Sequence, residues 1–323
     1  MALLTQEQLR GNIVLKMADS PPRFGSFVPS VDKQLGGFEY ANNGEWKEPF
    51  YFVQVTDIQY GMMGTMVGGN ESKRGWSWEI DNSNKCVEAL NRMVPKPKFV
   101  IVTGDIANDL PGQPDRENQE CDFRLAFSKL VPSIPLFCIP GNHDIGNTPT
   151  PETVDRYKAN FGDDYFSFWC GGVKFISPNT QYIKDPSKVA TLKEDHDRWL
   201  EEELADSRAK GCKQIILLQH IPWFLKTPDE PDDRYFNIPI EERAKWLKLF
   251  KESGVRYVFS GHYHRESSGR DGDLEMTVTS ALGAQLGSDE CGFRIIKVHG
   301  DQVTHRYVSC DDAPLDIDLS VPF

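Results

Sequence analysis

Five short apolar runs, separated by segments with helical spacing, constrain the fold of this 323-residue chain more than any other feature. The runs are FYFVQV (50–55), KFVIV (98–102), PLFCI (135–139), QIILL (214–218) and YVFS (257–260). Segments such as NKCVEALNRMV (84–94) and LKEDHDRWLEEELADSRAKG (192–211) lie between them and repeat their apolar residues with the period of an α-helix. Strands that alternate with helices form largely parallel sheets with helices on both faces. The sequence therefore predicts an α/β fold.

The two ends of the chain follow other patterns. EMTVTSALG (275–283) and GFRIIKVHGDQVTHRYVS (292–309) are typical of antiparallel strands, the second segment containing a His-Gly-Asp turn. Residues 1–48 are rich in Pro, Gly and Asn and have little periodicity. We expect them to form an N-terminal extension packed on one domain that covers residues 49–323.

Composition and charge exclude some classes of partner. The formal net charge of −12 argues against a broad nucleic-acid interface, because binding to phosphate backbones depends on clustered Lys and Arg. The first 22 residues have neither the pattern of a signal peptide nor an apolar run of about 20 residues, the length that a membrane span requires. We therefore expect a cytoplasmic, monomeric protein that binds neither nucleic acid nor membrane.

Polar side chains follow each apolar run where the predicted strand should end. Open α/β sheets bind ligands at the carboxyl ends of their strands, so these side chains should converge on one crevice. In chain order they are Asp57 and Gln59, Asp105 and Asp109, Asn142 and His143, His220, and finally His262 and His264.

This set contains carboxylates, amides and imidazoles but no thiolate. Such ligands suit divalent cations, and their number exceeds the four that a structural zinc needs, so the sequence favours a pair of metal ions. Each residue also has a purely structural reading. His220 alone could be a hydrogen-bonded core histidine, and Asp105 or Asp109 could cap a helix that begins within DLPGQPDRE (109–117).

The order of the polar motifs resembles one known family. GDIAND (104–109), GNHD (141–144), His220 and GHYH (261–264) are similar to the motifs of the calcineurin-like metallophosphoesterases, over the chain from about Pro49 to its end. DIQYG, LLQHIPWFL and FSGHYHR further resemble a cytosolic serine/threonine phosphatase of that family. The resemblance implies a four-layer α/β/β/α sandwich with two mixed sheets and two metal ions at one edge.

The resemblance also implies a role for each motif residue. Asp105 should bridge both metals, with Asp57, Gln59 and His264 completing the first site and Asn142, His220 and His262 the second. His143 should face the phosphate as a catalytic residue, oriented by Asp109. Most of the family has histidine where this chain has Gln59. The amide oxygen of Gln59 is a harder ligand, so we expect Mn or Mg at the first site, with Mn, Mg, Fe or Zn possible at the pair.

The implied function is a dinuclear-metal-dependent phosphatase that hydrolyses phosphate monoesters, by attack of a metal-bound hydroxide, in phosphoproteins or small phosphorylated substrates. Phosphoserine and phosphothreonine in proteins are the expected substrates. Two alternatives stay open: a phosphodiesterase for cyclic nucleotides or other small diesters, and a non-catalytic metal-binding protein. The loops at 61–78 and 225–237 could each contact substrate or be solvated.

Overall fold

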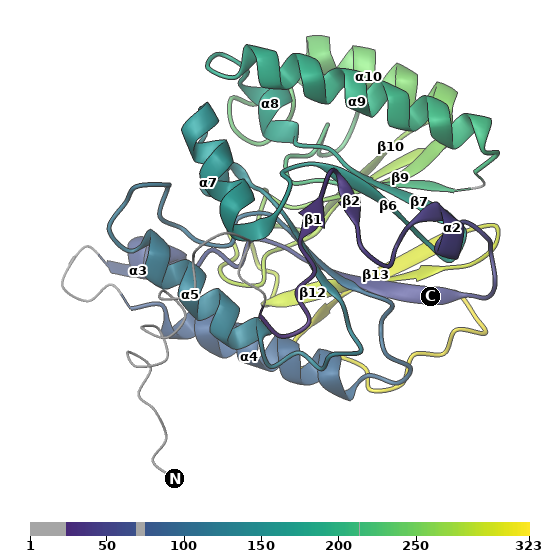
Figure 1. Cartoon of the computed structure of the whole chain (residues 1–323). Helices are drawn as coiled ribbons and strands as arrows, with labels where there is room; N and C mark the ends of the chain where they lie inside the picture. Colours follow the sequence, from purple (N-terminus) through teal and green to yellow (C-terminus); the bar gives the residue numbers. More distant parts are fainter. Residues whose placement is uncertain (1–23, 69–74, 213) are drawn as a thin grey trace.

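Two β-sheets lie face to face between two layers of helices in the computed structural model, which describes residues 24–68, 75–212 and 214–323 (Figure 1). The larger sheet has the order β1 (Ser30–Val31), β2 (Gln34–Leu35), β6 (Phe166–Cys170), β7 (Val173–Ser177), β8 (Ile215–Leu218), β9 (Val255–Ser260), β11 (Leu274–Val278) and β10 (Ser267–Asp271). The smaller sheet has the order β13 (Val303–Ser309), β12 (Gly292–Val298), β3 (Phe50–Val55), β4 (Val100–Thr103) and β5 (Leu136–Ile139). Both sheets are mixed.

Helices cover the outer face of each sheet (Figure 1). α8 (Thr180–Lys184), α9 (Ala190–Ala209) and α10 (Ile240–Ser253) lie over the larger sheet, and α4 (Ser77–Arg92) and α5 (Arg116–Phe127) lie over the smaller one. The other helices of the described residues are α2 (Tyr40–Asn43), α3 (Met62–Gly68), α6 (Asn142–Ile145) and α7 (Pro151–Phe161). The predicted α/β/β/α sandwich is confirmed.

The five predicted strands form two parallel groups, one in each sheet. β3, β4 and β5 pair in parallel in the smaller sheet, and β8 pairs in parallel with β9 in the larger sheet. β12 and β13 form the expected antiparallel pair. β11 departs from the expectation on one side, because it runs antiparallel to β10 but parallel to β9.

Alternating side chains of β3 show how the layers are held together. Phe50 and Phe52 point into a phenylalanine-rich layer between the sheets, whereas Tyr51, Val53 and Val55 join the core beneath the helices. Within the inter-sheet layer the Phe52 ring stacks on the Phe99 ring at 4.8 Å between centroids. This period-two alternation lets one apolar strand serve two cores.

The described part of the N-terminal extension joins the larger sheet. β2 pairs in parallel with β6 through Gln34 and Ser167, and the side chains of Phe24, Phe27 and Leu35 are buried. In the described part of the chain, every helix is too short or too polar to cross a bilayer.

Candidate metal centre

The predicted site residues meet where strands of both sheets end. β3, β4 and β5 of the smaller sheet lead to Asp57 and Gln59, to Asp105 and Asp109, and to Asn142 and His143 in α6; β8 and β9 of the larger sheet lead to His220 and to His262 and His264. Eight of the nine side chains are buried, and His143 is partly exposed. The structure thus brings the predicted residues to one end of the two sheets, although the Asp109 side chain faces α5.

The backbone at this place adopts a conformation that costs energy. Five of these residues have positive φ angles between 46° and 71°, in the left-handed region that non-glycine residues seldom occupy. They are Asp57, Gln59, Asp105, His262 and His264. Strain of this kind clusters at functional sites, because surrounding contacts must enforce it. The loops are therefore held in the shape that turns these side chains toward one another.

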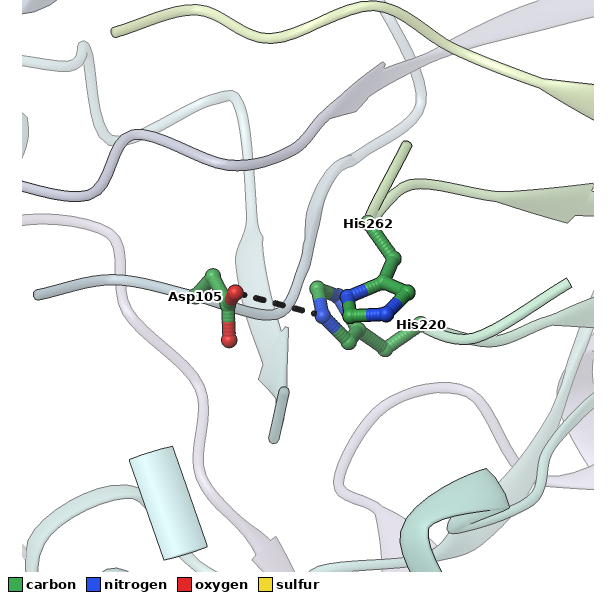
Figure 2. Close-up of side chains that lie close together, drawn as sticks. All are labelled: Asp105, His220 and His262. Atoms are coloured by element: carbon green, nitrogen blue, oxygen red, sulfur yellow. Dashed lines mark ion pairs between the residues drawn. The ribbon is translucent and has the colours of Figure 1, made fainter. Parts of the chain in front are cut away.

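The ionisable side chains form two groups that share Asp105. Asp105, His220 and His262 offer one ligand atom each within 4.8 Å of one another, and so do Asp57, Asp105 and His264. We call Asp57, Asp105 and His264 the first group, and Asp105, His220 and His262 the second group. Figure 2 shows the second group, with the Asp105 carboxylate facing the His220 ring at 3.4 Å from Oδ2 to Nε2. The first group repeats this arrangement, with His264 Nε2 3.4 Å from Asp57 Oδ1. A shared carboxylate between two such groups fits a pair of divalent ions.

Backbone carbonyls fix the tautomer of each histidine in these groups. His220 Nδ1 lies 2.8 Å from the Thr103 carbonyl, His264 Nδ1 contacts the Ala284 carbonyl, and His262 Nε2 lies 2.9 Å from the Tyr235 carbonyl. A carbonyl only accepts, so these three nitrogens carry protons. The opposite nitrogen of each ring is left with a lone pair for a metal, which is the usual arrangement of metal-binding imidazoles.

The amide and carboxylate oxygens of the first group lack protein partners. Among the described residues, no group donates a hydrogen bond to the buried atoms Asp57 Oδ1 and Gln59 Oε1. Asp57 Oδ2, by contrast, accepts from the Thr56 hydroxyl and the His262 backbone amide, each at 2.8 Å. Buried acceptors without donors are costly unless a cation satisfies them. The first group, together with the Gln59 oxygen, therefore fits a metal ion.

Asn142 is oriented in a similar way at the second group. Its Nδ2 donates to Asn147 Oδ1 at 2.8 Å and to the Tyr235 hydroxyl at 3.0 Å, which leaves Oδ1 3.0 Å from His220 Nε2. The Asn142 oxygen therefore lies beside His220 Nε2 and can act as a further ligand atom of the second group.

The charges of the centre keep its carboxylates ionised, whereas His220 must lose a proton before it can bind a metal. Burial alone would lower the pKa of His220, but the Asp105 carboxylate outweighs burial and raises this pKa to about 9. Burial and repulsion by His220 lower the pKa of His262 to about 3. Burial opposes ionisation of Asp105 and Asp57, yet attraction by His220 for Asp105 and by His264 for Asp57 lowers the pKa of both carboxyls. The carboxylates are therefore ionised and ready to bind a cation.

Two motif glycines are required by close packing. A Cβ on Gly141 would lie 2.1 Å from Asp105 Oδ1, and one on Gly261 would lie 1.9 Å from Thr56 Oγ1. Any larger residue would displace the strand ends that carry Asp105 and Asp57. The glycines of the GNHD and GHYH motifs thus have a steric role in the centre.

Sequence reasoning assigned no role to a buried ion-pair network behind the centre. Asp144 Oδ2 accepts from the backbone amides of Asp105 and Gly141 at 2.8 and 2.9 Å, and Asp144 Oδ1 accepts from Arg116 Nη2 at 2.9 Å. Arg116, which is 1% exposed, also donates to the carbonyls of Asp109 and His143. The network connects the loop after β4 with the loop after β5. In the sequence, the sign of this network was Asp144, the fourth residue of the GNHD motif.

The expected contact between Asp109 and His143 is not made in this structure. His143 Nδ1 instead donates to the Asn108 carbonyl at 2.6 Å, while the Asp109 carboxylate accepts from the Asp115 amide at 3.1 Å and from Gln119 Nε2 at 3.3 Å. The Asp109 carboxylate faces the first turn of α5 and the residue before it, and the Asn108 carbonyl takes its place at the imidazole. Neither Asp105 nor Asp109 caps a helix, since Asp115 precedes α5.

A family model and curated relatives agree with this geometry. The model of the calcineurin-like phosphoesterases matches residues 50–266. The chain belongs to the calcineurin-like phosphoesterase family. Within this family it is 42% identical to "Serine/threonine-protein phosphatase CPPED1" of Homo sapiens over 290 residues, which cover 89% of this chain and 92% of that protein. The protein of the same name from Danio rerio is 42% identical over 287 residues, 88% of this chain and 93% of that protein. The resemblance expected from the motifs is confirmed.

Solved structures of the calcineurin-like phosphoesterase fold superimpose on the chain despite low identity. A dimetal phosphatase from Danio rerio aligns with a TM-score of 0.59 at 15% identity, over 81% of this chain and 96% of that one. Purple acid phosphatase PPD1 from yellow lupin aligns with a TM-score of 0.57 at 14% identity, over 84% of this chain and 53% of that one. At such identities these similarities support the fold alone.

Proposed function

We propose that this member of the family hydrolyses phosphate monoesters and that its substrates are phosphoserine and phosphothreonine side chains of proteins. The observation that carries the proposal is the Asp105 carboxylate shared by two groups of ligand atoms. The substrate class is supported by the similarity to the Homo sapiens and Danio rerio relatives, which are both named serine/threonine-protein phosphatases.

The proposed ligands divide between two metal ions. Asp57, Gln59 and His264 would hold the first ion and Asn142, His220 and His262 the second, with Asp105 between them. Such a pair, when bound, neutralises phosphate oxygens and lowers the pKa of a coordinated water. Because the first site offers mainly oxygen atoms, we propose Mn²⁺ or Mg²⁺ there.

His143 is the proposed catalytic side chain. Its backbone amide donates to Asp105 Oδ1 at 2.8 Å and its ring is partly exposed, so it borders both the centre and solvent. With Nδ1 held by the Asn108 carbonyl, Nε2 is free to donate to a phosphoryl oxygen when protonated. Asp109 would act indirectly: it would hold in place the loop whose Asn108 carbonyl orients the His143 ring.

The rim of the first group offers a surface for a peptide. Trp78 is 50% exposed, yet its Nε1 donates to the Gly283 carbonyl at 2.9 Å, and the Gly283 amide donates in turn to the Asp57 carbonyl at 3.1 Å. An indole held beside the ligand loop can pack against the chain of a phosphoprotein. Lys73 and Arg74 of the same loop lie outside the described residues.

Turnover of matched substrates tests the proposal. Phosphoserine and phosphothreonine peptides, nucleotides, an aryl monoester and its diester should be assayed with added Mn²⁺, Mg²⁺, Fe²⁺ or Zn²⁺. Preference for phosphopeptides is the expected result. Faster turnover of diesters would favour the phosphodiesterase reading, and absence of turnover in protein that retains two metals per chain would favour a binding protein.

The Gln59→His variant tests the proposed metal preference. Imidazole is a better ligand for Fe and Zn than an amide oxygen, so the variant should retain more Fe or Zn after dialysis than the wild type does. Equal metal content in both proteins would contradict the assignment of Gln59.

We further propose a cytoplasmic monomer that binds neither nucleic acid nor membrane. The net charge of −12 and the thiols of all seven cysteines, none of them in a disulfide, support the proposal. Light scattering and cell fractionation would test it.

A further inference from the structure

Tyr235 contacts the second ligand group through three parts of the residue. Its carbonyl accepts from His262 Nε2 at 2.9 Å, its ring lies 4.5 Å from the His262 ring between centroids, and its hydroxyl lies 3.0 Å from Asn142 Nδ2. The side chain is still 39% exposed. Tyr235 therefore stands between the proposed second metal and solvent.

The loop that carries Tyr235 is held in place from both sides. On one side, Arg243 Nη1 donates to the carbonyls of Pro228 and Glu230 at 2.9 and 2.8 Å. On the other side, Lys184 Nζ donates to the carbonyls of Asp233 and Asn237 at 2.8 and 2.6 Å. The acidic segment 225–237 is thus pinned by cations, and Tyr235 is preorganised rather than free to move away.

The hydrogen bond with Asn142 decides where the tyrosine proton points. Asn142 Nδ2 can only donate, so the Tyr235 oxygen accepts in this contact and its own proton is directed elsewhere. No acceptor for that proton lies within hydrogen-bond distance in residues 24–68, 75–212 and 214–323 apart from solvent. Tyr235 also lines a cavity of about 250 Å³ together with Asn142, His262 and Arg234. The hydroxyl can donate into this space.

We propose that the Tyr235 hydroxyl is a further catalytic group that donates a hydrogen bond to a phosphoryl oxygen bound beside Asn142 and His262. This inference rests on the proposed phosphatase function, because it needs phosphate at the second ligand group. A preorganised donor aimed at a charged oxygen stabilises it in both the bound phosphate and the transition state. The bond is a contact and involves no proton transfer.

The experiment compares Tyr235→Phe with Asn147→Ala. Both variants remove one acceptor of the Asn142 amide, and both residues line the cavity, but only Tyr235→Phe removes the hydroxyl that we propose donates to phosphate. Phenylalanine keeps the ring and the carbonyl that contact His262. Binding of inorganic phosphate to Mn²⁺-saturated protein is measured by calorimetry, metal content by mass spectrometry, and Tyr40→Phe serves as a control at an exposed tyrosine in α2.

A donor role predicts that Tyr235→Phe weakens phosphate affinity by roughly 10-fold or more at full metal occupancy, the scale of a hydrogen bond to a charged group. Asn147→Ala and Tyr40→Phe should stay within about twofold of the wild type, since neither loses a hydrogen bond to phosphate. If Tyr235→Phe binds phosphate as the wild type does, or if both site variants lose affinity or metal equally, Tyr235 only orients Asn142 and the inference is wrong. Because phosphate binding needs no turnover, an inactive wild type that shows this difference would refute the proposed function and the catalytic role of Tyr235, but not its contact with phosphate.

Discussion

Replacing Gln59 with methionine should change stability in opposite directions with and without metal. The Gln59 side chain is 3% exposed, and its Oε1 has no donor among the described residues. A buried acceptor left unpaired costs about 1 to 3 kcal/mol, and methionine has similar length without that acceptor. In a chelating buffer the Gln59→Met variant should therefore unfold with a free energy about 1 kcal/mol or more above that of the wild type.

Bound metal should reverse the order of stability, so that the wild type becomes more stable than Gln59→Met. If Oε1 binds the first ion, its loss weakens the affinity for that ion, and each tenfold loss of affinity removes about 1.4 kcal/mol of the stabilisation by saturating metal. The measurement is urea unfolding at one pH, in chelator and in excess Mn²⁺. The wild type should gain more from Mn²⁺ than the variant does.

Gln54 provides a matched control in β3, the strand that precedes Gln59. This buried glutamine donates to Thr103 Oγ1 and the Ser260 carbonyl at 2.9 and 3.0 Å and accepts from Thr279 Oγ1 at 2.7 Å. Gln54→Met loses three hydrogen bonds of about 1 kcal/mol each and should be destabilised by roughly 3 kcal/mol in both buffers. The reasoning about Gln59 is refuted if Gln59→Met is no more stable than the wild type in chelator, or if Mn²⁺ stabilises the two proteins equally.

Three further changes test other parts of the centre. Asp105→Asn removes the charge that both ligand groups share, so turnover should be abolished with the fold retained by circular dichroism; an unchanged rate in metal-replete buffer would contradict the bridging role. His143→Ala should keep two metals per chain and lose roughly 100-fold in turnover, the scale of a lost acid catalyst, whereas loss of metal would make His143 a ligand. Burial alone would raise the pKa of Glu120, but Arg116 and Arg156 lower it to about 2, so its stabilisation is complete above its ordinary pKa near 4.5 and declines as pH falls toward 2. Urea unfolding should show Glu120→Gln much less stable than the wild type at pH 7, with a difference that narrows steadily as pH falls from about 4.5 toward 2; a constant difference would contradict this assignment.

The strands, and the side chains that meet where the strands end, could be read from the sequence because both rest on local patterns. An apolar run that ends in an acid, an amide or an imidazole marks the carboxyl end of a strand, and five such ends identified the crevice. The pairing of β11 was harder, since its pattern fits either strand direction. Its parallel contact with β9 depends on the crossover through β10.

The supporting residues of the centre lay beyond such patterns. Tyr235 reaches Asn142 from 93 positions away through an irregular loop, and no periodicity marks it. Arg116 lies on a helix where a charged residue is normally solvent-exposed, yet here it is buried against Asp144. The His143 ring donates to the Asn108 backbone carbonyl, and a backbone partner cannot be predicted from residue type. Contacts of this kind depend on three-dimensional placement and not on composition.

The distribution of the ligands along the chain also governs when the centre can be assembled in a cell. The hydrogen bond from the His262 amide to Asp57 spans 205 residues, and the sheets that carry its two ends pair separately. At about 5 to 20 residues per second, a ribosome needs roughly 10 to 40 s to make that interval, so the first ligands leave the exit tunnel long before their partners exist. A nascent chain cannot close either ligand group before His262 and His264 have emerged. Metal insertion is therefore confined to the period after nearly the whole domain has been synthesised, and a truncated translation product would lack a complete centre.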